Sequence, residues 1–269
     1  MILACSGSSG LRKYFKYGFD SDNKELSHVN WPQIVGDSLG IEVHNISEGV
    51  LVNEHILQKC TKYIVKNPTK YSICLIGWNN WFATYTYNVK SLKYLTGYNT
   101  ISPNVYIRKE GYPEGYWHSK LQQVYDSPLG SIQEEEKAIV EWNLLSIFKP
   151  LEHLCEHYGI KLYSYHMFRP FGYRGMTELW PGVPKDAPVF PKWTDYLEED
   201  VLYDEIESYT KYFDKNKFIG WPYHPNLGGS TFEDEAQVDR DKFYRSKVDV
   251  HPTDIGHHFI AEKFLNVIK

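Results

Sequence analysis

Apolar residues along the chain recur with two different spacings, and segments with the two spacings alternate. Short apolar or alternating runs predict strands at residues 1–5, 41–45, 71–78 and 161–167. Apolar residues at helical spacing predict helices at residues 30–39, 53–66, 131–158 and 254–269. Strands that alternate with helices in this way indicate a parallel sheet covered on both faces. We therefore expect an α/β protein, a three-layer α/β/α sandwich with a central parallel sheet.

Helix caps and breaks refine this prediction. Asn30 is the expected N-cap of the first helix, Pro32 fits its first turn, and Gly40 ends it. In the long helical stretch, Pro150 lacks a backbone donor, so we expect the helix to break there. The run at residues 71–78 is continuously apolar, which is typical of a central strand in a sheet covered on both faces.

Two stretches interrupt the alternation of strands and helices. Residues 81–130 and 168–247 are rich in Tyr, Trp, Pro and Gly, and neither shows sustained periodicity. We interpret both as insertions at the carboxyl edge of the sheet, where the ligand sites of α/β proteins lie. No linker separates a second domain, so residues 1–269 are expected to form one domain with these two insertions.

Composition and charge narrow the classes of partner. The net charge of −5 and the pI near 6.1 argue against a general nucleic-acid or anionic-membrane surface. No apolar run approaches the roughly 18 residues of a membrane span, and the first residues look like a strand rather than a signal peptide. Four cysteines without a CxxC pair suggest reduced, mostly buried thiols in a cytoplasmic protein. The sequence leaves the oligomeric state open.

Aromatic residues are unusually frequent, at 16% of the chain with 22 Tyr and 8 Trp. Packing in the core and in the insertions explains most of them. Alternatively, the flat faces of Tyr and Trp provide stacking surfaces for sugar rings. Composition does not decide between these two interpretations.

A serine follows the first predicted strand, in the segment Cys5-Ser6-Gly7-Ser8-Ser9-Gly10. A nucleophile in an α/β hydrolase lies on the turn that leaves a strand, so Ser6 occupies a suitable position. Its small neighbours allow a tight turn and leave N–H groups able to face an oxyanion. The alternative is that this segment is simply a flexible turn.

A histidine precedes the last predicted helix, in the segment Asp249-Val250-His251-Pro252. Pro252 fixes the backbone after this histidine, and Thr253 or Asp254 can cap the helix. His251 in this loop could reach the edge of the sheet and act as general base to a serine. Asp249 is placed to orient the imidazole.

Taken together, these segments resemble the SGNH/GDSL hydrolase superfamily, in particular its divergent members with a G-C-S-F-T-x-G first block. Four short blocks occur in the family's order: Ala4–Gly10 resembles this first block, Asn45–Asn53 resembles N-L-A-x-x-G-x-S-N, Gly77–Asn80 resembles G-x-N-D, and Asp249–Pro252 resembles D-x-x-H-P. The sequence departs from the family in that Gly49 comes one position early, with Val50 in the usual slot. The last block is also one residue shorter.

The resemblance implies a flavodoxin-like SGNH fold and a serine esterase or deacetylase without metal or cofactor. Ser6 would be the nucleophile, His251 the general base and Asp249 its acid. The oxyanion would be met by the Ser6 N–H, the Gly49 region and the Asn79 amide. An O-acyl ester is the implied substrate, with an acetylated carbohydrate as one candidate. A non-catalytic carbohydrate- or partner-binding protein on the same fold is the alternative.

A literal Gly-Asp-Ser-Leu string also occurs, at residues 36–39. Its serine, Ser38, falls at the end of the first predicted helix, just before the second strand. A helix end does not present a nucleophile at the carboxyl edge of a sheet. We therefore expect Ser38 to be unrelated to catalysis.

A metal site is a third interpretation. His153 and His157 are spaced i, i+4 on the long predicted helix, with Cys155 between them, and such pairs do bind zinc. However, histidine in a last helical turn is also favoured by the helix dipole. No third ligand is spaced to join the pair, so we expect no metal.

Overall fold

Five parallel strands form the centre of the computed structural model, which describes residues 1–6, 30–47, 53–79, 81, 140–168, 199–224, 227–244 and 252–268. The strands are β1 (Ile2–Ser6), β2 (Val43–Asn45), β3 (Ile73–Trp78), β4 (Lys161–His166) and β5 (Phe218–Ile219). Their order across the sheet is β2-β1-β3-β4-β5, and every neighbouring pair is parallel. The predicted parallel sheet is therefore confirmed.

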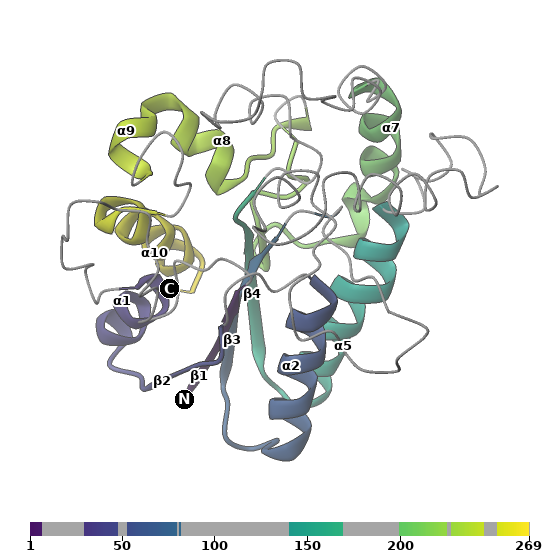
Figure 1. The fold of residues 1–269 in the computed structure, drawn as a ribbon. Coiled ribbons are helices and arrows are strands. Elements are labelled where there is room, and N and C mark those ends of the chain that lie inside the picture. The colour runs from purple at the N-terminus through teal and green to yellow at the C-terminus, as the bar shows by residue number, and fades with distance from the viewer. Residues whose placement is uncertain are drawn as a thin grey trace, which may run out of the picture.

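Helices cover both faces of this sheet (Figure 1). On one face, α1 (Trp31–Leu39) packs against α10 (Asp254–Ile268). On the other face lie α2 (Asn53–Lys66), the π-helix η2 (Trp142–Phe148) and α5 (Lys149–His157). The next described helix after β1 is α1, on one face, and the next described helices after β3 are η2 and α5, on the opposite face. The carboxyl ends of β1 and β3 are therefore the point where the connections diverge, and ligands of open α/β sheets bind at such points.

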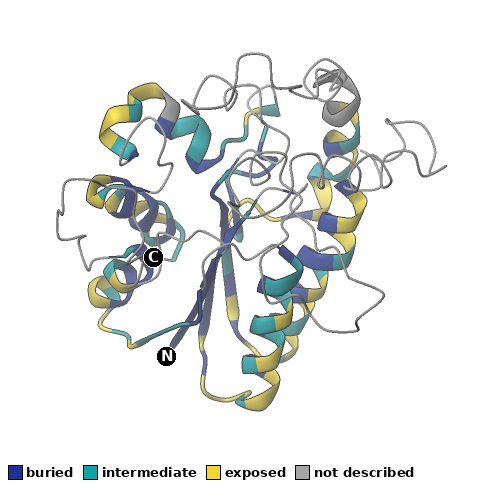
Figure 2. Cartoon of the chain, viewed as in Figure 1, coloured by how far each residue is buried: buried dark blue, intermediate teal, exposed yellow. Residues whose placement is uncertain are grey.

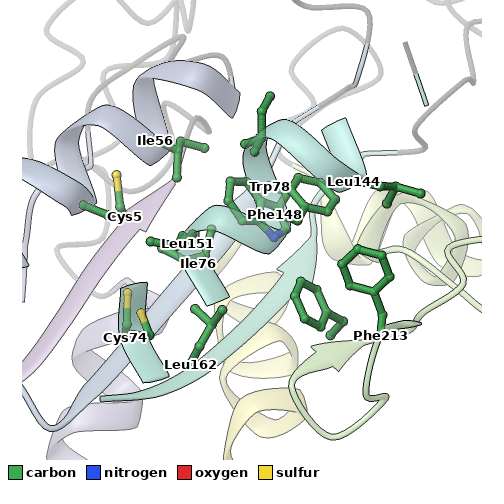
Figure 3. Close-up of a cluster of buried hydrophobic side chains, with 14 of the residues drawn as sticks. Cys5, Ile56, Cys74, Ile76, Trp78, Leu144, Phe148, Leu151, Leu162 and Phe213 are labelled. Atoms are coloured by element: carbon green, nitrogen blue, oxygen red, sulfur yellow. The ribbon is translucent and has the colours of Figure 1, made fainter. Parts of the chain in front are cut away.

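The sheet separates two layers of hydrophobic core, and buried residues line both of its faces (Figure 2). On the α1 and α10 side, the rings of Trp31 and Phe264 stack with centroids 4.6 Å apart. On the α2 and α5 side, Trp78 stacks on Phe148 at 4.3 Å, within the cluster shown in Figure 3. All four cysteines are buried in this second layer without forming disulfides, as expected.

Local signals at both ends of α1 placed this helix correctly. The Asn30 side chain accepts a hydrogen bond from the Gln33 N–H, and Gly40 ends α1 in the left-handed conformation with φ of 65°. Ser38 lies in the last turn of α1, as predicted, and it is exposed. Among the described residues, no helix is long and apolar enough to cross a membrane.

The predicted break at Pro150 is wrong, because the helix runs on from Val140 to His157. The seven residues before Lys149 adopt a π-helix, and the Lys149 N–H donates to the Leu144 carbonyl five residues back. This wider turn shifts the hydrogen-bond register immediately before the proline. Pro150 then occupies the first turn of α5, where its missing N–H costs little.

Residues 199–244 contain more regular structure than expected for an insertion. They form α7 (Glu199–Tyr209), η3 (Thr210–Tyr212), β5, α8 (Phe232–Ala236), η5 (Gln237–Asp239) and α9 (Arg240–Phe243). The strand β5 extends the sheet by pairing Phe218 with Ser164 and Ile219 with Tyr165. The expectation of an insertion over residues 168–247 is corrected at this strand. A two-residue strand is too short to produce an alternating pattern.

Candidate functional site

Ser6 is the last residue of β1, at the carboxyl edge of the sheet, and it is fully buried. In the parallel register its partner on β3 is Gly77. A Cβ atom at position 77 would lie 2.6 Å from Ser6 Oγ and 2.9 Å from Ser6 Cβ, distances that real contacts do not reach. The absence of a side chain at Gly77 therefore makes the space that the Ser6 side chain fills. The sequence singled out these two residues separately, and the structure puts them in contact.

The Ser6 backbone N–H has a partner within the fold. It donates a hydrogen bond to Ser47 Oγ at 3.0 Å, and the Ser47 N–H in turn donates to Asn45 Oδ1 at 3.0 Å. The hydroxyl of Ser47 thus extends the β1–β2 ladder one step beyond its last backbone bond, from the Ile46 N–H to the Ala4 carbonyl. The sequence assigned the Ser6 N–H to an oxyanion. In the structure that N–H donates to Ser47 Oγ.

Asn79 directly follows β3, the strand next to β1, and is partly buried. One side chain, that of Asn53, forms hydrogen bonds with both the N–H and the carbonyl of Asn79. The Asn79 N–H donates to Asn53 Oδ1 at 2.8 Å, and Asn53 Nδ2 donates to the Asn79 carbonyl at 3.1 Å. Asn53 is the first residue of α2, so the start of this helix is tied to the end of β3. Ser6 and Asn79 therefore lie at the ends of adjacent strands.

A further buried amide supports this arrangement. Asn143 Oδ1 accepts from Asn53 Nδ2 at 2.9 Å, and Asn143 Nδ2 donates to the Trp81 carbonyl at 3.3 Å. Asn53 and Asn143 are 1% and 2% exposed, so these hydrogen bonds lie in the protein interior. The sequence interpretation gave neither residue a role. The available signal was a polar residue, Asn143, at core spacing between Val140 and Ile147.

The other three expected site residues, His251, Asp249 and Gly49, lie outside the described residues. The start of the helix after His251 is described. Thr253 Oγ1 accepts from the Gly256 N–H at 3.1 Å, which confirms Thr253 as a cap of α10. Thr253, two residues after His251, therefore has a defined place at the start of α10.

Another histidine, His166, ends β4 but is buried on the α2 and α5 side among the rings of Trp81, Phe148 and Tyr223. Its Nδ1 lies 2.6 Å from the Phe168 carbonyl, which assigns the ring proton to Nδ1 as donor. Burial lowers the pKa of His166 to about 3, so the ring is neutral at physiological pH. Its contacts are those of a packed core residue.

The histidine pair considered for a metal does not form a ligand set with the cysteine between them. His153 and His157 are exposed on α5, whereas Cys155 points into the core. Within the described part of the chain, no three His, Cys, Asp or Glu side chains are arranged to hold a metal ion.

Comparison with known proteins gives no identification: no family model matches the chain, and no curated protein and no solved structure is detectably similar to it. Any functional assignment therefore rests on the residues of the site and on the topology that positions them.

Proposed function

We propose that this protein is a serine hydrolase of the SGNH type that acts on an O-acyl ester. The observation that carries the proposal is the contact of the Ser6 side chain with Gly77, two residues before Asn79. A serine and an amide at the ends of adjacent parallel strands provide a nucleophile and an oxyanion donor at one edge of the sheet.

The topology supports the same proposal. The strand order β2-β1-β3-β4-β5 is that of flavodoxin-like doubly wound sheets, whose ligands bind at the switch between β1 and β3. Ser6 and Asn79 are the residues at the ends of those two strands. The candidate chemistry and the topological switch point therefore coincide.

In the proposed mechanism, Ser6 Oγ attacks the ester carbonyl while His251 takes its proton and then passes it to the leaving alcohol. Asp249 orients the imidazole. Water, activated by His251, then releases the acyl group from Ser6. The Asn79 side-chain amide and the Gly49 N–H donate hydrogen bonds to the oxyanion. The Ser6 N–H is not one of these donors, because it donates to Ser47 Oγ. These steps require no metal or cofactor.

We further propose that the alcohol part of the substrate is a carbohydrate and the acyl group an acetyl group. The support is compositional, because Tyr and Trp from the aromatic-rich stretches can line a wall on which sugar rings stack. The four buried free thiols support a reducing, cytoplasmic setting for the reaction.

A non-catalytic binding protein on the same fold is the second candidate. The observation that favours it is that Ser6 is 0% exposed and that its N–H donates to Ser47 rather than facing a ligand. In that case the same edge of the sheet would bind an intact ester or sugar without cleaving it.

Turnover of p-nitrophenyl acetate separates the two candidates. We expect the wild-type protein to release p-nitrophenol catalytically and Ser6→Ala to lose this activity. Asn79→Ala should lower kcat by roughly 100-fold, because one oxyanion donor contributes about 3 kcal/mol to the transition state. Equal rates for wild type and Ser6→Ala, with both folded, would favour the binding protein.

A further inference from the structure

Both Nδ2 hydrogens and the Oδ1 of the Asn53 side chain have hydrogen-bond partners in the fold. Its two Nδ2 hydrogens go to two different oxygens, the Asn79 carbonyl at 3.1 Å and Asn143 Oδ1 at 2.9 Å. Its Oδ1 accepts from the Asn79 N–H at 2.8 Å. A carboxamide provides two donors and an acceptor in one plane, so this set of partners requires an amide.

Asn143 holds Asn53 in that orientation. With its Oδ1 bonded to Asn53 and its Nδ2 bonded to the Trp81 carbonyl, Asn143 fixes which end of the Asn53 amide carries the donors. The π-helix η2 carries Asn143, and π-helical turns are frequent at functional sites. These hydrogen bonds therefore link Trp81 to Asn79 through the side chains of Asn143 and Asn53.

We infer that Asn53 and Asn143 are positioning residues that hold the Asn79 peptide so that its side-chain amide meets the oxyanion on the Ser6 adduct. This inference rests on the proposed hydrolase function. The buried Asn53 side chain bonds both the N–H and the carbonyl of Asn79, so the backbone at Asn79 cannot rotate without breaking one of these hydrogen bonds. Donors fixed in advance are the ones that stabilise a transition state most.

Asn53→Asp is the most informative variant, because it keeps the shape of the side chain and replaces the Nδ2 donor with an acceptor. A carboxylate oxygen would replace Nδ2 and face the Asn79 carbonyl and Asn143 Oδ1, both of which are acceptors. Asn143→Leu is the second variant, and it removes the support of Asn53 without adding charge. Ile64→Val is the matched control, since Ile64 is fully buried on the same helix, three turns from Asn53.

The test is steady-state hydrolysis of p-nitrophenyl acetate together with the midpoint of thermal unfolding. We expect Asn53→Asp and Asn143→Leu to lower kcat by roughly 10- to 100-fold with KM changed less than about threefold, as for a misplaced transition-state contact. Ile64→Val should lower the unfolding midpoint and leave kcat unchanged. If either amide variant kept wild-type kcat while folded, the inference would be overturned.

A double-mutant cycle with Asn79→Ala distinguishes positioning from general damage. If Asn53 and Asn143 act through Asn79, adding Asn143→Leu to Asn79→Ala should cost less than about threefold in kcat. Full additivity of the two losses contradicts the inference while leaving the hydrolase proposal intact. Wild-type protein that does not hydrolyse the ester contradicts the proposed function, and the inference with it.

Discussion

Replacing Gly77 with Ala tests the contact between β1 and β3 on which the candidate site depends. The added Cβ would lie 2.6 Å from Ser6 Oγ, 2.9 Å from Ser6 Cβ and 3.2 Å from Met167 Cε. Because β3 is paired on both sides, with β1 and β4, its backbone has little freedom to retreat. The side chain of Ser6 must move instead, and overpacking of this kind costs about 1–3 kcal/mol.

Urea denaturation measures this cost as a lower midpoint at an unchanged m-value. The matched background is Ser6→Gly, which removes both of the Ser6 atoms closest to the new Cβ. In that background we expect Gly77→Ala to cost less than about 0.5 kcal/mol, since the two closest of its three nearest contacts are gone and the third, to Met167 Cε, is 3.2 Å long. The same cost in both backgrounds would refute the packing of Ser6 on Gly77. A lower rate of p-nitrophenyl acetate hydrolysis by Gly77→Ala alone should accompany the loss of stability.

Two further predictions concern the fold around the site. Burial lowers the pKa of His166 to about 3 from 6.5, so the unfolded state takes up a proton first as the pH falls below 6.5. The contribution of His166 to the free energy of unfolding should therefore be fully present above pH 6.5 and decrease by up to about 5 kcal/mol towards pH 3. When the urea midpoint is plotted against pH, His166→Phe should flatten this part of the curve. Thr253→Ala removes the hydroxyl that accepts from the Gly256 N–H, and we expect a loss of about 0.5–2 kcal/mol in urea denaturation. A Thr253→Ser variant keeps the cap and should restore most of that stability, whereas equal midpoints for the Ala and Ser variants would contradict the capping role.

Apolar periodicity predicted the parts of the fold in which a whole face of an element is buried. The helix α2 begins and ends where the spacing placed it, and four of the five strands were found in this way. The strand β5 has only two residues, so it carries no period. The π-helix before Pro150 depends on which carbonyl each N–H selects, and the spacing of apolar residues does not encode that choice.

In the candidate site too, the sequence predicted what a local pattern encodes and missed the long-range contacts. Ser6 is the last residue of one apolar strand and Asn79 directly follows another, so the sequence placed both at one edge of the sheet. The bonds of Asn79 to Asn53, 26 residues away, and of Asn53 to Asn143, 90 residues away, were missed. Long-range hydrogen bonds between amides leave no local pattern. The same holds for Ser47, whose bond to the Ser6 N–H spans 41 residues.

Labelling by a fluorophosphonate tests the central claim most directly, because this reagent reacts with an activated serine and forms a stable adduct. We predict one adduct per folded chain by intact mass, located by peptide mapping on the segment that contains Ser6. Ser6→Ala should abolish the label, whereas Ser38→Ala, which changes an exposed helical serine, should leave it unchanged. Folded wild-type protein that takes up no label, or takes it up on a serine other than Ser6, would contradict the account.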